Sequence, residues 1–251
     1  MKKWINAFFM AWGMFLAVPC PYPKWDEEAR DRMLVCLPLI GLIIGGVWVG
    51  AAYLSELLII PRMIDGAVMA SVPWLMTGFI HLDGFMDVSD AVLSRRDLET
   101  RQKILKDPHV GAFAVISIGL LFLFSWSVFC SWNLKVERLL PLALIPVVSR
   151  ASAGMAVIAL KPMQTSQYNS AHNKKYIIPL AVMLAAAVIV PIIPFGFYGL
   201  APLAAAVGYW LAVWYGTRKL GGMSGDVSGF ALTLSELVGS LFVIINWEAF
   251  L

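Results

Sequence analysis

The 251 residues are 60% hydrophobic and only 14% charged, and their mean hydropathy is +0.77. Soluble domains are about half apolar and a quarter charged, so this chain is more apolar and much less charged than they are. A soluble globule of this length could not bury that much apolar surface. The net charge of +3 is too small to indicate a nucleic-acid-binding protein. We therefore expect an all-α, polytopic integral membrane helical bundle that forms a single domain over residues 1–251.

The first apolar run, residues 4–18, is shorter than the roughly 20 residues that a membrane-spanning helix needs. Two lysines precede it, as in a signal peptide, but a Pro-Cys-Pro sequence follows in place of a small-x-small cleavage site. We expect an uncleaved short helix that is associated with the membrane or re-enters it.

Seven further apolar blocks follow, and each predicts a transmembrane helix. They cover residues 34–60, 66–80, 110–132, 139–160, 176–195, 198–216 and 227–247. If residues 4–18 do not cross, most of the 19 Lys and Arg residues fall on one side, in the N-terminus and the polar segments 19–33, 81–109, 161–175 and 217–226. The positive-inside rule places that side in the cytoplasm. We expect a bacterial or archaeal cytoplasmic membrane, with these segments on its cytoplasmic face.

The segment from His81 to Asp90 carries the strongest chemical signal. Asp83, Asp87 and Asp90 lie at positions i, i+4 and i+7, which puts three carboxylates on one face of a helix. Like charges beside an apolar block repel one another unless a cation lies between them, and carboxylate oxygens suit Mg²⁺. We expect these aspartates to bind magnesium, with Asp90 or His81 as general base. An exposed acidic helix end is the blander interpretation.

A basic stretch separates this segment from the next apolar block. Arg95 and Arg96 open it, and although a positive-inside loop explains most of its charge, arginines there suit the phosphates of an anionic substrate. Asp107 closes it and is placed either to cap the next helix or to contact substrate.

Arg150 lies within the block at 139–160. An arginine at membrane depth is costly, so it should face the bundle interior and find a partner, either the aspartates or a phosphate. We therefore treat Arg150 as a catalytic candidate. Snorkelling to the membrane surface is the alternative.

A glycine-rich turn precedes the last block. Gly222, Ser224 and Gly225 allow close backbone approach, and the free N–H groups of the following helix start suit a phosphate. Asp226 is a further candidate metal ligand. Glu236 follows ten residues later, close to three helical turns, so both side chains can face one interior.

In this order and spacing, the motifs make the chain similar to the cobalamin synthase (adenosylcobinamide-GDP ribazoletransferase) family. The resemblance covers nearly the whole chain and is carried by Leu37-Pro38-Leu39-Ile40-Gly41 with Gly45, His81-Leu82-Asp83-Gly84 with Asp87 and Asp90, Asp107 with Gly111, Ser149-Arg150, and Gly222-Met223-Ser224-Gly225-Asp226 with Glu236.

The chain also departs from the family pattern. Ala91 stands where the family usually has Gly, and Ser224 stands where it has Thr. Pro108 and His109 replace a usual Ser-Arg pair, which removes a permanent positive charge and leaves no settled phosphate role for His109.

The resemblance implies the joining of adenosylcobinamide-GDP to α-ribazole or its 5′-phosphate. The products would be adenosylcobalamin or its 5′-phosphate, and GMP. It implies Mg²⁺ as cofactor, with Asp83 and Asp87 as metal ligands and Arg150 stabilising the negative charge of the phosphate. Asp226 and Glu236 would bind either the metal or the nucleotide. The lipid bilayer is a necessary partner, and self-association or association with other corrinoid-pathway enzymes stays open.

Two other functions are consistent with parts of the pattern. A CDP-alcohol phosphotransferase also uses spaced aspartates, but its usual Ala-Arg pair is missing after Asp90. A transporter with an acidic relay would spread its acids through the bilayer, whereas here they gather toward one face.

Overall fold

The computed structural model describes residues 2–133, 135–163 and 173–245. Its α-helices are α1 (Lys2–Phe15), α2 (Arg30–Leu57), α3 (Arg62–Met76), α4 (Ile80–Leu93), α5 (Leu98–Ile104), α6 (Ala112–Cys130), α7 (Val136–Ala159), α8 (Ile177–Ile189), α9 (Ile192–Phe195), α10 (Ala201–Leu220) and α11 (Gly225–Ile244). Short 3₁₀ turns, η1 (Glu27–Ala29), η2 (Lys174–Tyr176) and η3 (Tyr198–Leu200), precede α2, α8 and α10. No β-strand occurs in these ranges, which confirms the all-α prediction.

Six helical segments in the described part are long and apolar enough to cross a membrane. They are Glu27–Leu57, Ala112–Cys130, Glu137–Ala159, Lys174–Phe195, Tyr198–Leu220 and Gly225–Ile244. The seventh predicted block, 66–80, differs: it forms most of α3, which reaches the required length only together with α4, and the two helices are bent by 93°. Helix α1 is too short to be counted, as its sequence indicated.

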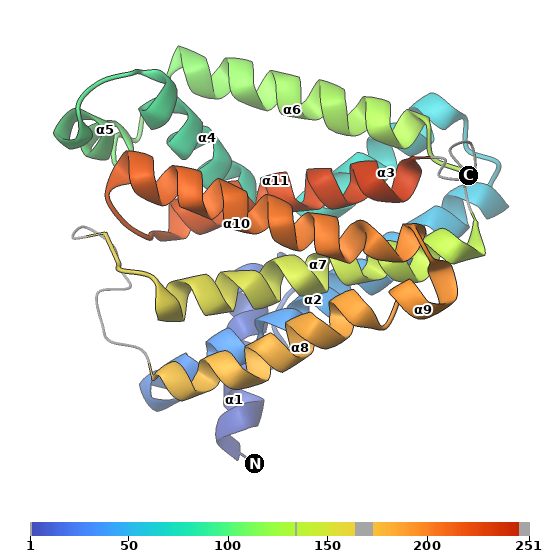
Figure 1. Ribbon diagram of the computed structural model, residues 1–251, viewed down its shortest axis with the longest axis horizontal. Coiled ribbons are helices and arrows are strands. Elements are labelled where there is room, and N and C mark those ends of the chain that lie inside the picture. Colours follow the sequence, from blue (N-terminus) through green and yellow to red (C-terminus); the bar gives the residue numbers. More distant parts are fainter. Residues whose placement is uncertain (1, 134, 164–172, 246–251) are drawn as a thin grey trace.

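The long helices run side by side along the molecule, and α1 lies across them (Figure 1). Helices α2 and α7 pack together, as do α10 and α11, while α7 also contacts α8, α10 and α11. Helix α6 covers α3 and α4, and α1 rests on α2. The buried side chains of α1, α2, α4, α7 and α11 form one hydrophobic cluster, which surrounds the site described below.

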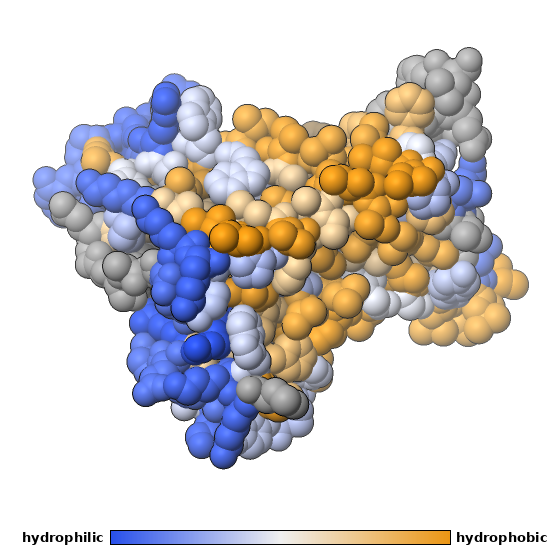
Figure 2. Space-filling view, turned by 60° about the horizontal axis from the view of Figure 1, so that its bottom comes forward, coloured by the Kyte–Doolittle hydropathy of each residue, from blue (hydrophilic) through white to orange (hydrophobic). Residues whose placement is uncertain are grey.

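Polar side chains gather at one end of the bundle, beyond a broad apolar surface (Figure 2). Hydrogen bonds tie the polar segments together there. The Gln102 amide donates to the Leu220 carbonyl at 2.8 Å, the Met163 N–H donates to the Met223 carbonyl, and the Met223 N–H donates to the Lys161 carbonyl. The backbone N–H of Asn173 donates to Asp31 at 3.3 Å. The predicted meeting of these segments is confirmed, except for residues 164–172, which lie outside the described ranges.

The opposite end of the bundle is fixed around Arg138, which is 2% exposed. Its guanidinium lies 5.0 Å from the Tyr198 ring centre and 6.0 Å from that of Trp132, and it donates to Asn133 and to the Ile244 carbonyl. These contacts join the start of α7 to the end of α11. The charged residue is therefore a structural anchor remote from the acidic segments.

Candidate active site

Helix α4 presents the three aspartates as predicted, because it runs unbroken from Ile80 to Leu93. Asp83 is exposed, whereas Asp87 and Asp90 are half-buried. The sharp bend before α4 is made by two successive left-handed residues, Gly78 at φ 58° and Phe79 at φ 64°. The bend turns the polar helix away from the line of α3 and directs it across the polar end of the bundle.

A fourth carboxylate reaches this face from α11. The two backbones touch at Gly84, where a Cβ would lie only 2.8 Å from the carbonyl oxygen of Asp226. Asp87 consequently has three negatively charged neighbours, Asp83, Asp90 and Asp226. The absence of a side chain at Gly84 is what allows Asp83 and Asp226, which are 143 positions apart in the chain, to belong to one acidic cluster.

Ser224 fixes the start of α11. Its hydroxyl accepts a hydrogen bond from the Val227 N–H at 3.2 Å, and its oxygen lies 3.4 Å from Asp226 Oδ2. Gly222 is buried against the backbone of Met163, so it shapes the turn rather than facing the acids. Ser224 and Gly225 face the cavity described next.

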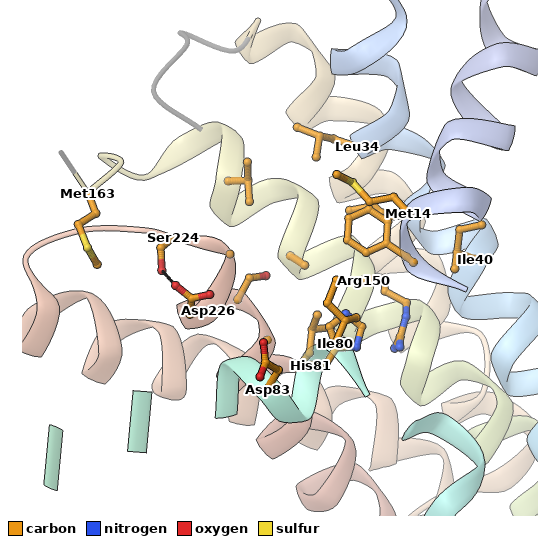
Figure 3. A pocket seen from close by; sticks show the side chains of 18 of the residues that line it. Met14, Leu34, Ile40, Ile80, His81, Asp83, Arg150, Met163, Ser224 and Asp226 are labelled. Atoms are coloured by element: carbon orange, nitrogen blue, oxygen red, sulfur yellow. Dashed lines mark hydrogen bonds between the residues drawn. The ribbon is translucent and has the colours of Figure 1, made fainter. Parts of the chain in front are cut away.

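A cavity of about 390 Å³ opens beside the acidic cluster. Its lining comes from α1, α2, α4, α7 and α11, together with Leu105, Lys106 and Met163 (Figure 3). Asp83, Asp226 and Ser224 lie on one side of it, and Arg150 and His81 lie near its middle. Asp87 and Asp90 do not belong to this lining. The cavity therefore joins an acidic edge to a basic centre.

Arg150 is 2% exposed and forms a buried ion pair with Glu236 of α11. Its Nη1 atom makes this bond and also lies 3.1 Å from Ser149 Oγ. Its Nε and Nη2 atoms are buried and have no hydrogen-bond partner among the described residues. Arg150 therefore faces the bundle interior and has a partner, as predicted, but that partner is Glu236 rather than one of the aspartates of α4.

The apolar wall of the cavity is formed mainly by α1 and α2. Met14 and Phe15 come from the end of α1, and Leu34, Leu37 and Ile40 come from α2. The Phe15 ring stacks on the imidazole of His81, with ring centres 6.5 Å apart and planes at 19°. His81 is 8% exposed, and its carbonyl accepts a hydrogen bond from Thr233 at 3.2 Å. The short N-terminal helix thereby becomes part of the site.

Asp90 is held at the start of α6. Its Oδ1 atom accepts from the Ala114 N–H at 3.3 Å, and a Cβ on Gly111 would lie 2.1 Å from the same carboxylate. A negative charge is favourable at a helix N-terminus, where N–H groups lack partners. The geometry therefore gives Asp90 a helix-capping contact, which the sequence did not suggest.

Asp107 does not cap α6, contrary to one of the two predicted roles. The helix begins at Ala112, and Asp107 instead accepts from the His109 N–H at 3.0 Å and contacts the His109 imidazole at 2.7 Å. The backbone hydrogen bond, and next the imidazole contact, hold the pKa of this exposed carboxyl below its ordinary value. Asp107 is therefore engaged within its own loop, and the carboxylate that contacts the start of α6 is that of Asp90.

The two arginines predicted to bind phosphate lie away from the cavity. Arg95 and Arg96 are exposed and are not part of its lining. Lys106, from the same basic stretch, does line it. Nothing in the sequence distinguished Lys106 from its neighbours, because only the path of the chain after α5 brings it to the cavity.

The acidic cluster supplies some, but not all, of the ligands that a magnesium ion needs. Among the described residues, no group of three or more His, Cys, Asp or Glu side chains is arranged to hold a metal ion. Mg²⁺, however, is usually bound by one or two carboxylates together with waters and substrate phosphates. Asp83 and Asp226 supply hard oxygen donors at the cavity edge, so the donor set is compatible with that mode.

Comparison with known proteins covers almost the whole chain. The family model described as Cobalamin-5-phosphate synthase matches residues 7–244. The chain is 37% identical to an adenosylcobinamide-GDP ribazoletransferase of Clostridium perfringens, over 97% of this chain and 99% of the relative. Enzymes of the same name are 33% identical in Lachnoclostridium phytofermentans and 32% identical in Geobacillus kaustophilus, covering 97% and 95% of this chain and 95% of each relative. No solved structure matches the chain.

Proposed function

The chain belongs to the cobalamin-5-phosphate synthase family, and on this premise we propose that it joins adenosylcobinamide-GDP to α-ribazole or its 5′-phosphate. The products are adenosylcobalamin, or its 5′-phosphate, and GMP. The family makes the protein a membrane transferase of cobalamin biosynthesis. The CDP-alcohol phosphotransferase and transporter interpretations are disfavoured, because the similarity to ribazoletransferases extends over almost the whole length.

One observation carries the assignment of the site: the contact of Gly84 with Asp226 brings carboxylates of α4 and α11 to the edge of a cavity that also holds Arg150. Breaking a phosphoanhydride requires both neutralisation of phosphate charge and correct placement of the nucleophile. Carboxylates for a cation, an arginine for phosphate oxygens and an enclosed space meet these needs together.

In the proposed reaction, a ribose hydroxyl oxygen of the ribazole substrate forms a bond to the phosphorus attached to cobinamide. The bond from that phosphorus to the bridging oxygen breaks, and the electron pair leaves with GMP. A general base takes the hydroxyl proton. Of the two candidates, only His81 lines the cavity, whereas Asp90 is held at the start of α6, so we assign the base to His81.

We propose that Asp83 and Asp226 would hold Mg²⁺ together with waters and substrate phosphates, and that the bound ion would offset the negative charge of the diphosphate. Asp83 and Asp226 lie at the cavity edge, and Asp87 is a near neighbour of both although it does not line the cavity. We also propose that the polar end faces the cytoplasm, where nucleotide substrates are made, since most of the positive charge lies there. Self-association, or association with other corrinoid-pathway enzymes, is compatible with the exposed apolar helix faces.

The direct test uses detergent-purified protein with adenosylcobinamide-GDP and α-ribazole 5′-phosphate, in Mg²⁺ and in EDTA. We expect a cobalamin product and GMP in equal amounts by mass spectrometry, and only in Mg²⁺. Undiminished turnover in EDTA would reject the magnesium assignment. If neither product forms in Mg²⁺ or in EDTA, while a related enzyme used as control is active, the proposed reaction is rejected.

A further inference from the structure

A second hollow of the protein lies on its apolar surface, remote from the acidic cluster. Helices α8 and α10 lie on either side of α7 and pack on it, but they scarcely touch each other (Figure 1). A groove of about 820 Å³ runs between them. Its lining consists of Ala, Leu, Val and Ile side chains together with Trp210 and Trp214. Because both helices belong to candidate membrane spans, the groove faces the lipid.

Basic side chains stand at one end of this groove, just before α8 and in the last turn of α10. They are Lys174, Lys175, Arg218 and Lys219. The antiparallel course of the two helices brings all four to the polar end of the bundle. No Asp or Glu occurs in the sequence between Glu137 and Asp226, so neither helix supplies a negative charge to balance them.

Arg218 joins this positive charge to the groove itself. Its guanidinium lies over the Trp214 ring, 4.7 Å from the ring centre, and Trp214 lines the groove. Arg218 forms no ion pair with any residue that the structure describes. The aromatic contact holds a positive charge at the mouth of an apolar groove and leaves it available to an anion.

The length of the groove indicates what kind of molecule fills it. The lining runs from Leu203 to Trp214 on α10, about 16 Å along the helix axis. The hydrocarbon core of a bilayer is about 30 Å thick, so the groove is about as long as one leaflet is deep, whereas a spanning helix needs about twice that length. Arg218 lies one helical turn beyond Trp214, where an arginine reaches the headgroup level. The dimensions therefore suit an acyl chain with its headgroup at the polar end.

The charge at the mouth selects among occupants. A second copy of this chain in the same membrane would bring its own basic segments to the same face, so like charges would meet. An anionic phospholipid brings the opposite charge, and the planar guanidinium matches two oxygens of its phosphate. The tryptophans at the groove suit the boundary between chain and headgroup, because one part of the ring is apolar and its N–H is polar.

We propose that the groove between α8 and α10 binds one anionic phospholipid of the leaflet nearest the polar end. An acyl chain lies along Leu184, Ala185 and Trp210, and the phosphate lies at Arg218. The lipid fills the space between two helices that make few contacts of their own, so its binding stabilises the folded bundle. The site is separate from the cavity at α4 and α11, and the proposal does not depend on the reaction assigned to that cavity.

The test measures lipid retention by native mass spectrometry of the full-length protein released from detergent. The probes are phosphatidylglycerol and phosphatidylcholine with identical chains, so a difference reports the headgroup alone. We expect one phosphatidylglycerol to be retained per chain in preference to phosphatidylcholine. Arg218→Gln should lower this preference about fivefold, the usual contribution of one basic residue near an anionic surface. Arg96→Gln removes an exposed arginine outside the groove and should leave the preference unchanged.

A second pair of variants tests the groove itself. Ala185→Trp places a large ring in the groove and should abolish retention of both lipids. Ala186→Trp is the matched control, because Ala186 is exposed on the same helix but does not line the groove. Thermal unfolding in mixed micelles gives an independent readout: phosphatidylglycerol should raise the unfolding temperature of the wild type and of Ala186→Trp, but not of Ala185→Trp. Arg218→Gln keeps the test decisive if Ala185→Trp does not fold.

Each other result overturns part of the proposal. Equal retention of the two lipids by the wild type, or an unchanged preference in Arg218→Gln, would reject the anionic headgroup at Arg218. Retention of phosphatidylglycerol by Ala185→Trp would place the lipid outside the groove. A wild-type dimer that Ala185→Trp dissociates would show that a second copy covers the groove instead. Product formation by the wild type is measured separately, so none of these results decides the proposed reaction.

Discussion

Arg150 on α7 and Glu236 on α11 are 86 residues apart in the chain, yet their side chains form a hydrogen-bonded ion pair inside the bundle. Their side chains are 3% and 7% exposed. The pair fixes the guanidinium beside the cavity and links two helices that both contribute to its lining. It therefore serves the stability of the bundle and the geometry of the site at once.

The buried pair predicts a strong asymmetry between single and double variants. Glu236→Gln or Arg150→Gln alone leaves one charge buried without its partner, at a cost of about 3–5 kcal/mol. Replacing both should cost clearly less, because no uncompensated charge remains. The measurement is reversible unfolding in mixed micelles. A double variant as unstable as the sum of the singles would show that the two side chains do not interact.

Carboxylates at the cavity edge should be indispensable for turnover. We expect Asp83→Asn and Asp226→Asn each to lower kcat by about 100-fold or more, the usual loss when a preorganised electrostatic group is removed from a reaction centre. Both asparagines preserve size, so the unfolding transition should stay near that of the wild type. A rate within a factor of a few of the wild type in either variant would remove that residue from the site.

Close approach of α4 and α11 should depend on Gly84. In Gly84→Ala the new Cβ would lie 2.8 Å from the carbonyl of Asp226, so the helices must separate and the acidic cluster must widen. We expect Gly84→Ala to lower activity strongly while the expression level stays close to that of the wild type. Gly50→Ala on α2 is the matched control, because nothing lies within 4 Å of a Cβ there. Equal activity in the two variants would contradict the geometric role.

Asp90 allows a direct choice between capping and catalysis. Asp90→Asn keeps an oxygen that can accept from the Ala114 N–H, so a capping role predicts activity within a few-fold of the wild type. Asp90→Ala should then be less stable by about 0.5–2 kcal/mol, the usual cost of losing a helix cap. Stability follows from thermal unfolding and activity from GMP release. A collapse of turnover in Asp90→Asn with normal stability would instead make Asp90 the base or a metal ligand.

Membrane orientation can be measured with single cysteines. The three native cysteines are first replaced. Lys103 is 73% exposed at the polar end, so a cysteine at this position can react with a membrane-impermeant maleimide. Because we propose that the polar end faces the cytoplasm, Lys103→Cys should react only after spheroplasts are permeabilised. Ile59→Cys, in the loop between α2 and α3, is 87% exposed and should react without permeabilisation. The reverse pattern would place the active site on the outside.

The location of the helices and of the acidic stripe was predictable from local sequence. Long continuous apolar blocks predict helices in a bilayer, because a helix satisfies all its backbone hydrogen bonds internally, whereas the strands of a membrane β-barrel are shorter and alternate apolar with polar residues. The spacing of Asp83, Asp87 and Asp90 then follows from helix geometry alone. The sharply bent pair of α3 and α4 was not predictable, because the block at 66–80 has the composition of a span and the left-handed turn at Phe79 is not encoded by a glycine.

The sequence by itself determined the membrane class, the clustering of polar segments at one end, and the carboxylates and arginine available for chemistry. Each of these depends on composition and short-range periodicity. Tertiary structure alone decided that Glu236 pairs with Arg150, that Asp90 caps α6, and that the short helix α1 supplies part of the apolar wall. The physical reason is that such contacts depend on which faces of distant helices meet, and this is set by packing over the whole bundle rather than by any local pattern.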